Sequence, residues 1–252
     1  ANAIIQSGQE KMGEELLRDT LRWNPRAIQK DRILSSLGDM ELRHGKEKKA
    51  LEFYARFEKE TLGSAIFGET MLKQARLLKK RGNTAETLRV LEAILAFPAA
   101  KGQDKAEALV TIGDIYFANG KPETAIPYYQ RVYVMHGRWK PWVAKAYLRS
   151  GEAFEKIKDP TSARRTYHEL VSNPELAEFP ETEIANKHLL ALGGPQRGPR
   201  RQGVVAAQPL AEAVQRRQLV ADARAQPDVA QKPQRQGRQR RAQCDVGLRF
   251  VA

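Results

Sequence analysis

The sequence contains one cysteine, Cys244, among its 252 residues. A single cysteine cannot form a disulfide within the chain, and it cannot supply a cysteine-based zinc site. No run of about 18 apolar residues occurs, so the sequence gives no sign of a membrane-spanning helix. A charged start followed by a short apolar stretch, the pattern of a signal peptide, is also missing from the first residues.

Motifs for catalysis and cofactor binding are absent as well. The sequence has no glycine-rich phosphate loop, no nucleophile motif with a neighbouring base and no His-Glu-x-x-His motif. Its histidines lie in separate segments, none of them three or four residues from another: His44, His136, His168 and His188. We therefore predict that the chain is not an enzyme and that it holds no cofactor and no metal.

The positive charge is unevenly distributed. The net charge of the chain is +13, and +8 of it lies in residues 195–252, which hold 12 basic and 4 acidic residues. This tail is rich in Arg, Gln and Pro and poor in apolar residues, a composition that predicts disorder. Three interpretations stay open: a basic segment that binds nucleic acid or an anionic surface, densest at residues 235–241, a passive solubilising tail, and a stretch translated in the wrong frame.

A repeat governs the first 194 residues. Small residues recur at steps of 37, 38 and 38 residues: Gly38, Ala75, Gly113 and Gly151. Twelve residues after each comes a second small or short residue: Ala50, Thr87, Ala125 and Ala163. Four residues further comes a large one: Tyr54, Leu91, Tyr129 and Tyr167. Such a period indicates one structural unit repeated along the chain.

Each unit has the pattern of two helices joined by a turn. In the third unit, Leu109, Ile112 and Tyr116 follow the three- and four-residue spacing of one helix face. Asn119-Gly120 then ends this helix, and Pro122 suits the first turn of the next, where its missing N–H costs no hydrogen bond. Small residues at facing positions allow the two helix backbones to approach closely.

These residues resemble the tetratricopeptide repeat. The third unit supplies its full pattern: Leu109, Gly113, Tyr116, Ala125 and Tyr129. The first and fourth units match over most positions, and the second keeps only Ala75, Gly82-Asn83 and Leu91, with Thr87 where Ala is usual. The resemblance implies an all-α superhelical solenoid of helical hairpins that acts as a non-enzymatic scaffold. Its implied partner is a protein or peptide held in a concave groove.

We predict a repeat domain over residues 1–194, followed by the tail, 195–252. Its parts are a partial repeat at 1–30, four repeats at about 31–67, 68–105, 106–143 and 144–180, and a capping helix at 181–192. The step exceeds the usual 34 residues, and such long steps are similar to those of bacterial cell-envelope assembly scaffolds. Because the chain opens inside a repeat, we expect a C-terminal fragment of a longer protein. The compartment stays open between cytoplasm and bacterial cell envelope.

The resemblance also implies which residues face the groove. They occupy recurring positions of the first helix in each hairpin: Arg32, Asp39, Leu72, Arg76, Val110, Asp114, Phe117, Leu148 and Glu152. We expect apolar pockets at the Leu, Val and Phe positions, against the alternative of a solvated face with residual packing residues. Two alternative functions are nucleic-acid or anionic-surface binding by the tail and a role as an accessory domain of a cell-envelope assembly machine.

The tryptophans have two interpretations. Trp139 and Trp142 flank Pro141 ahead of the fourth repeat, where they either contact a partner or fill the seam between adjacent repeats. Trp23 is expected to fill a seam in the same way. In the predicted capping helix we expect Ile184, His188, Leu189 and Leu192 to point inward.

Overall fold

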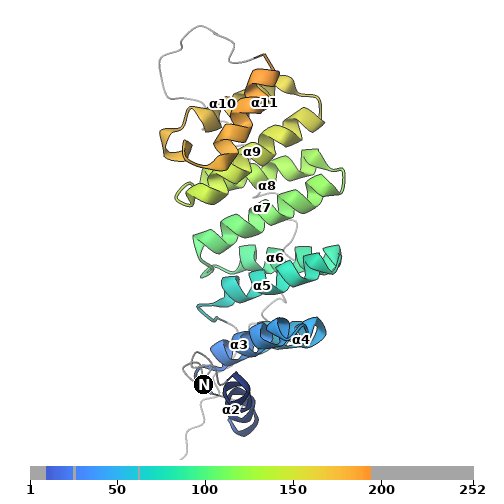
Figure 1. Ribbon diagram of the computed structural model, residues 1–252, viewed down its shortest axis with the longest axis vertical. Coiled ribbons are helices and arrows are strands. Elements are labelled where there is room, and N and C mark those ends of the chain that lie inside the picture. The colour runs from blue at the N-terminus through green and yellow to red at the C-terminus, as the bar shows by residue number, and fades with distance from the viewer. Residues whose placement is uncertain (1–9, 25–26, 62, 194–252) are drawn as a thin grey trace, which may run out of the picture. The chain divides into compact units, whose positions relative to one another are not determined.

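The computed structural model describes residues 10–24, 27–61 and 63–193, and the predicted basic tail lies outside these residues. Within them the regular structure is entirely helical, which confirms the predicted all-α fold (Figure 1). The helices are α2 (Glu10–Trp23), α3 (Lys30–Arg43), α4 (Glu47–Glu60), α5 (Phe67–Lys80), α6 (Thr84–Ala96), α7 (Gly102–Ala118), α8 (Pro122–Met135), α9 (Lys140–Lys156), α10 (Pro160–Val171) and α11 (Pro180–Ala191). A short 3₁₀ helix, Pro174–Leu176, precedes α11.

The helices pack as consecutive hairpins. The pairs α3/α4, α5/α6, α7/α8 and α9/α10 each make extensive contact, and each second helix also contacts the first helix of the next hairpin. First helices touch one another as well, α5 with α7, α7 with α9, and α9 with α11. In Figure 1 the ribbon colours follow this order along the stack of hairpins from blue to orange. The arrangement gives every interior hairpin two neighbours, as in a repeat protein.

The turn inside each hairpin needs a backbone conformation that favours glycine. Gly120 ends the turn after α7 with a φ of 72°, a value that residues with a Cβ rarely adopt. The fourth hairpin departs from this pattern, because Lys158 takes the equivalent place with a φ of 62°. There Asp159 follows immediately and caps α10, its side chain accepting a hydrogen bond from the Ser162 N–H.

A glycine of the first helix lies directly against a tyrosine ring of the second. A Cβ placed on Gly113 would come within 2.5 Å of the Tyr129 ring, and one on Gly38 within 2.5 Å of the Tyr54 ring. Gly151 and Tyr167 repeat the contact in the fourth hairpin. All three tyrosines are fully buried. The periodic small and large residues of the sequence are therefore the two halves of one packing contact.

Two apolar residues that were predicted to be buried are exposed. Ile184 is 41% exposed, because α11 buries Thr182, Ala185 and Leu189 instead. Trp23 ends α2 and is 80% exposed, so it fills no seam among the described residues. Trp139 and Trp142, by contrast, are partly buried against the core of the third and fourth hairpins.

We predict that Gly113→Ala destabilises the protein by about 1–2 kcal/mol. The added methyl group collides with a ring that has no space to move, and this overpacking outweighs the roughly 1 kcal/mol that alanine gains over glycine inside a helix. Urea denaturation followed by circular dichroism measures the change. Gly137→Ala is the matched control, since its Cβ would meet only a backbone oxygen at an ordinary 3.7 Å. Unchanged or higher stability of Gly113→Ala would contradict the packing argument.

Candidate functional site

Each packed tyrosine donates a hydrogen bond from its hydroxyl to a carboxylate of the first helix. Tyr54 donates to Asp39 at 2.7 Å, and Tyr129 donates to Asp114 at 3.0 Å. Burial of the ring, together with the neighbouring carboxylate, raises the pKa of Tyr54 and of Tyr129 above the usual value. The hydroxyls therefore stay protonated as donors, and the acceptor carboxylates are held at fixed places on the first helices.

The fourth hairpin uses a different acceptor. Tyr167 donates to Glu155 at 2.5 Å, and Glu155 also contacts His188 Nδ1 of α11 at 2.8 Å. Glu152, which follows Gly151 as Asp114 follows Gly113, is turned instead to Arg149 at 2.7 Å. The longer Glu side chain reaches the tyrosine from one helical turn further along α9.

Two of these carboxylates, together with Glu107, form ion pairs between consecutive first helices. Asp39 of α3 accepts from Lys73 of α5 at 2.8 Å, and Glu107 of α7 accepts from Arg76 of α5 at 2.9 Å. Asp114 of α7 lies 3.7 Å from Lys145 and 3.5 Å from Arg149, both of α9. We call this surface the ladder face and define it by these residues: Asp39, Lys73, Arg76, Glu107, Asp114, Lys145, Arg149, Glu152, Glu155 and His188.

The polar residues predicted for the groove lie on two parts of the first helices. The ladder face includes Asp39, Arg76, Asp114 and Glu152, each engaged in the contacts just described. Arg32 lies apart from them, exposed in the first turn of α3. The structure thus brings four of the five predicted polar residues onto one recurring surface.

The predicted apolar pockets are wrong at three of four positions. Leu72 is 4% exposed, Val110 is fully buried and Leu148 is 6% exposed, so none of them offers an accessible anchor. Each packs in the core because a first helix is covered both by its own hairpin partner and by adjacent hairpins. Phe117 alone keeps part of its ring accessible, while the rest packs against the core.

The ion pairs themselves were not predicted from the sequence. Arg76 and Glu107 are 31 residues apart, Asp39 and Lys73 are 34 apart, and Glu155 and His188 are 33 apart. Opposite charges at a separation slightly shorter than the repeat step are therefore the signal that would have found them.

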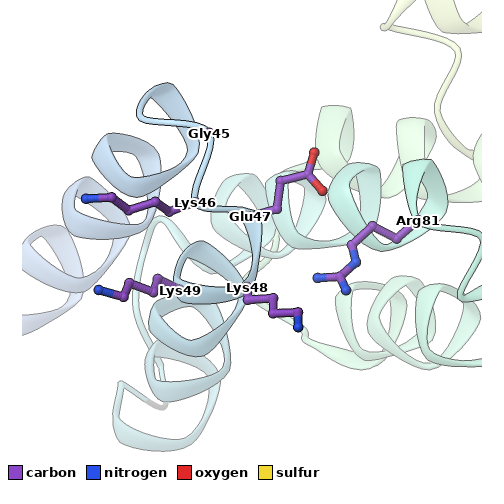
Figure 2. Close-up of a pocket in the computed structure, with 6 residues that line it drawn as sticks. All are labelled: Gly45, Lys46, Glu47, Lys48, Lys49 and Arg81. Atoms are coloured by element: carbon purple, nitrogen blue, oxygen red, sulfur yellow. The ribbon is translucent and has the colours of Figure 1, made fainter.

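A second feature is an open depression between the first two hairpins, with a volume of about 360 Å³. Figure 2 shows the residues that line it: Gly45, Lys46, Glu47, Lys48, Lys49 and Arg81. Glu47 accepts a hydrogen bond from Lys80 at 2.7 Å, and this bond, with the charges of Lys80 and Arg81, lowers the pKa of the Glu47 carboxyl. The lining is cationic apart from this one carboxylate.

The described residues contain no group of three His, Cys, Asp or Glu side chains placed to hold a metal ion. None of the described helices is long and apolar enough to cross a membrane.

Hairpins of this kind, repeated along a chain with a small residue packed on a large one, define a helical-repeat protein. A family model described as tetratricopeptide repeat matches residues 72–138 and 110–178. Residues 72–178 of the chain thus carry the tetratricopeptide repeat pattern that the sequence predicted. Comparison with curated protein sequences finds no match.

Solved structures with the same fold come from proteins of low sequence identity. A tetratricopeptide repeat protein from Parabacteroides merdae is 16% identical, with a TM-score of 0.56 over 87% of this chain and 76% of that one. The MamA protein is 16% identical, with a TM-score of 0.52 over 81% and 93%. A variant of the nearly identical TPR-like repeats from a putative Podosopora anserina kinesin light chain is 17% identical, with a TM-score of 0.52 over 79% and 100%. At such identities the likeness shows the fold alone.

We predict that Tyr129→Phe lowers the free energy of unfolding by about 1–2 kcal/mol, because it removes the hydrogen bond to Asp114 and leaves the ring packing intact. Chemical denaturation measures the loss. Tyr147→Phe is the control: that ring stacks on Tyr133 at 4.0 Å, and no hydrogen bond of its hydroxyl is found among the described residues. Equal effects of the two variants would show that the carboxylate contact contributes nothing.

The partly buried Tyr147 also predicts a loss of stability at alkaline pH. Burial raises the pKa of Tyr147 to about 12 in the folded protein, whereas an unfolded tyrosine ionises near pH 10. Below pH 10 the hydroxyl of Tyr147 is protonated in both states, so its full contribution to the free energy of unfolding is present. Between about pH 10 and 12 only the unfolded state loses the proton, and the free energy of unfolding falls by up to about 1.4 kcal/mol per pH unit. Denaturation midpoints measured from about pH 8 to 11.5 test this, and Tyr147→Phe should reduce the slope by its own share. A stability that is flat above pH 10 would contradict the prediction.

Proposed function

We propose that this chain is a non-enzymatic scaffold that binds a protein or peptide partner along the ladder face. Tetratricopeptide repeat proteins are generally scaffolds for protein–protein interactions. The observation that carries the proposal is the half-buried Phe117 of α7, an aromatic ring three residues after Asp114 of the ladder face. An accessible aromatic among charged groups is a common anchor in protein interfaces.

The charges near Asp114 support exchange of their contacts with a ligand. The side chain of Arg149 is 40% exposed and that of Lys145 is 35% exposed, so water reaches both although both lie near Asp114. Exposed ion pairs contribute little to folding stability, commonly below about 1 kcal/mol. A partner that supplies its own carboxylates could therefore replace these contacts at small cost. Asp114 would keep its place through Tyr129.

We propose residues 1–194 as the repeat domain that carries this function. Nucleic-acid or anionic-surface binding would depend on the basic tail, residues 195–252, which lies outside the described residues. A role as an accessory domain of a cell-envelope assembly machine rests on the long repeat step alone. No contact among the described residues favours either alternative over a protein partner.

Site-specific crosslinking tests the proposed binding face without disturbing the core. A photoreactive phenylalanine analogue at position 117 should crosslink a discrete partner in lysate of the source organism. The same analogue at Met135 is the control, because that side chain is 63% exposed at the end of α8, a second helix that contributes no residue to the ladder face. We expect a strong crosslinked product from position 117 and little from position 135.

The partner is then identified and its affinity measured with the purified chain by calorimetry. Charge reversal at Arg149 should weaken binding by about tenfold, the loss of one or two charged contacts. Crosslinks from position 135 equal to those from 117, or unchanged affinity after charge reversal, would contradict the assignment of the face.

A further inference from the structure

We propose that the open depression between the first two hairpins binds an acidic segment of a protein partner. The surface in question, the basic turn surface, is defined by Lys46, Lys48, Lys49, Lys80 and Arg81. It lies at the turns of the α3/α4 and α5/α6 hairpins and shares no residue with the ladder face. The inference therefore adds a second binding surface to the function proposed above.

Three of these cations form no close ion pair with any residue that the structure describes. Glu47 forms an ion pair with Lys80 at 2.7 Å, and Lys46 lies 3.7 Å from Glu41. Over residues 10–24, 27–61 and 63–193, no ion pair within 4.0 Å involves Lys48, Lys49 or Arg81. On the ladder face, by contrast, positive side chains are matched by carboxylates of an adjacent hairpin.

Equivalent turns in the second and fourth hairpins show that folding does not require a lysine before the second helix, although Lys121 holds that place in the third hairpin without a capping hydrogen bond. The residue before α6 is Asn83, whose side chain accepts from the Glu86 N–H, and the residue before α10 is Asp159, which caps in the same way. Lys46 holds this place before α4 and makes no capping hydrogen bond. Lysines in a first helical turn also oppose the helix dipole, which favours acidic residues there.

Residues that disfavour the local structure in which they lie commonly mark a functional surface. Figure 2 shows Lys48 and Arg81 extending toward one another from the two hairpins, while Lys46 and Lys49 extend together on the other side of the turn. Like charges that converge in this way repel one another. Carboxylates placed between them would remove that repulsion.

The shape and lining of the depression select the kind of partner. It is open to solvent, and Gly45 contributes no side chain to it, so it suits an extended chain with several carboxylates. Its lining residues are Gly, Lys, Glu and Arg, with no aromatic ring on which a nucleotide base could stack. An acidic peptide therefore fits this surface better than a single-stranded nucleic acid.

The test compares two variants of the full chain that lose equal charge. The first is Lys48→Gln/Lys49→Gln/Arg81→Gln, and the matched control replaces three lysines at the later turns, Lys121, Lys156 and Lys158, with Gln. The probes are a fluorescein-labelled decaglutamate peptide and a labelled ten-nucleotide thymidine oligomer. Fluorescence anisotropy at about 50 and 150 mM salt gives each affinity, and circular dichroism checks that helicity is unchanged.

We expect the first variant to bind decaglutamate about tenfold more weakly at about 50 mM salt and the control to change less than about twofold, since screening weakens exposed charge contacts at the higher salt. Equal losses in the two variants would show that only net charge matters and would overturn the proposal. So would a loss confined to the oligonucleotide, which would identify the surface as a nucleic-acid site. Neither result bears on the crosslinks from position 117, so the two proposals fail separately.

Discussion

The close approach of a first-helix glycine to a second-helix tyrosine is the contact on which the rest of the structure depends. In three of the four hairpins it brings the two backbones together and buries a large ring. The hydroxyl of that ring then needs an acceptor, because an unpaired buried donor is costly. Asp39 and Asp114 meet this need in two hairpins, and Glu155 meets it in a third.

The tyrosine contacts have a consequence beyond packing. A carboxylate fixed by a buried hydroxyl also faces the next hairpin, where Lys73 or Arg149 lies opposite. The contact that closes one hairpin thus also orients the charges that link it to its neighbour. The second hairpin lacks the tyrosine, having Leu91 at that place, and there Arg76 reaches across to Glu107 instead. The charged surface proposed for partner binding follows from how each hairpin is closed.

Much of the fold was predictable because its signal is local and periodic. The spacing of Gly113, Ala125 and Tyr129 predicts two packed helices from one unit alone, and its recurrence predicts the stack. The candidate site was less predictable. The places of Leu72 and Leu148 in the repeat pattern predicted that they line a groove, but those side chains are buried by neighbouring hairpins. Periodicity indicates which side of a helix is apolar and gives no measure of how closely the next hairpin covers it.

The sequence by itself determined the hairpin, its turn and its glycine–tyrosine contact, since each depends on residues close together in the chain. Only the tertiary structure decided which charges meet across hairpins and which remain alone. Asp39 and Lys73 pair over 34 residues, whereas Lys48 and Lys49, in an equally charged stretch, form no ion pair among the described residues. The difference arises because an ion pair depends on the distance between side chains of separate repeats, which rotation and spacing of the packed hairpins set.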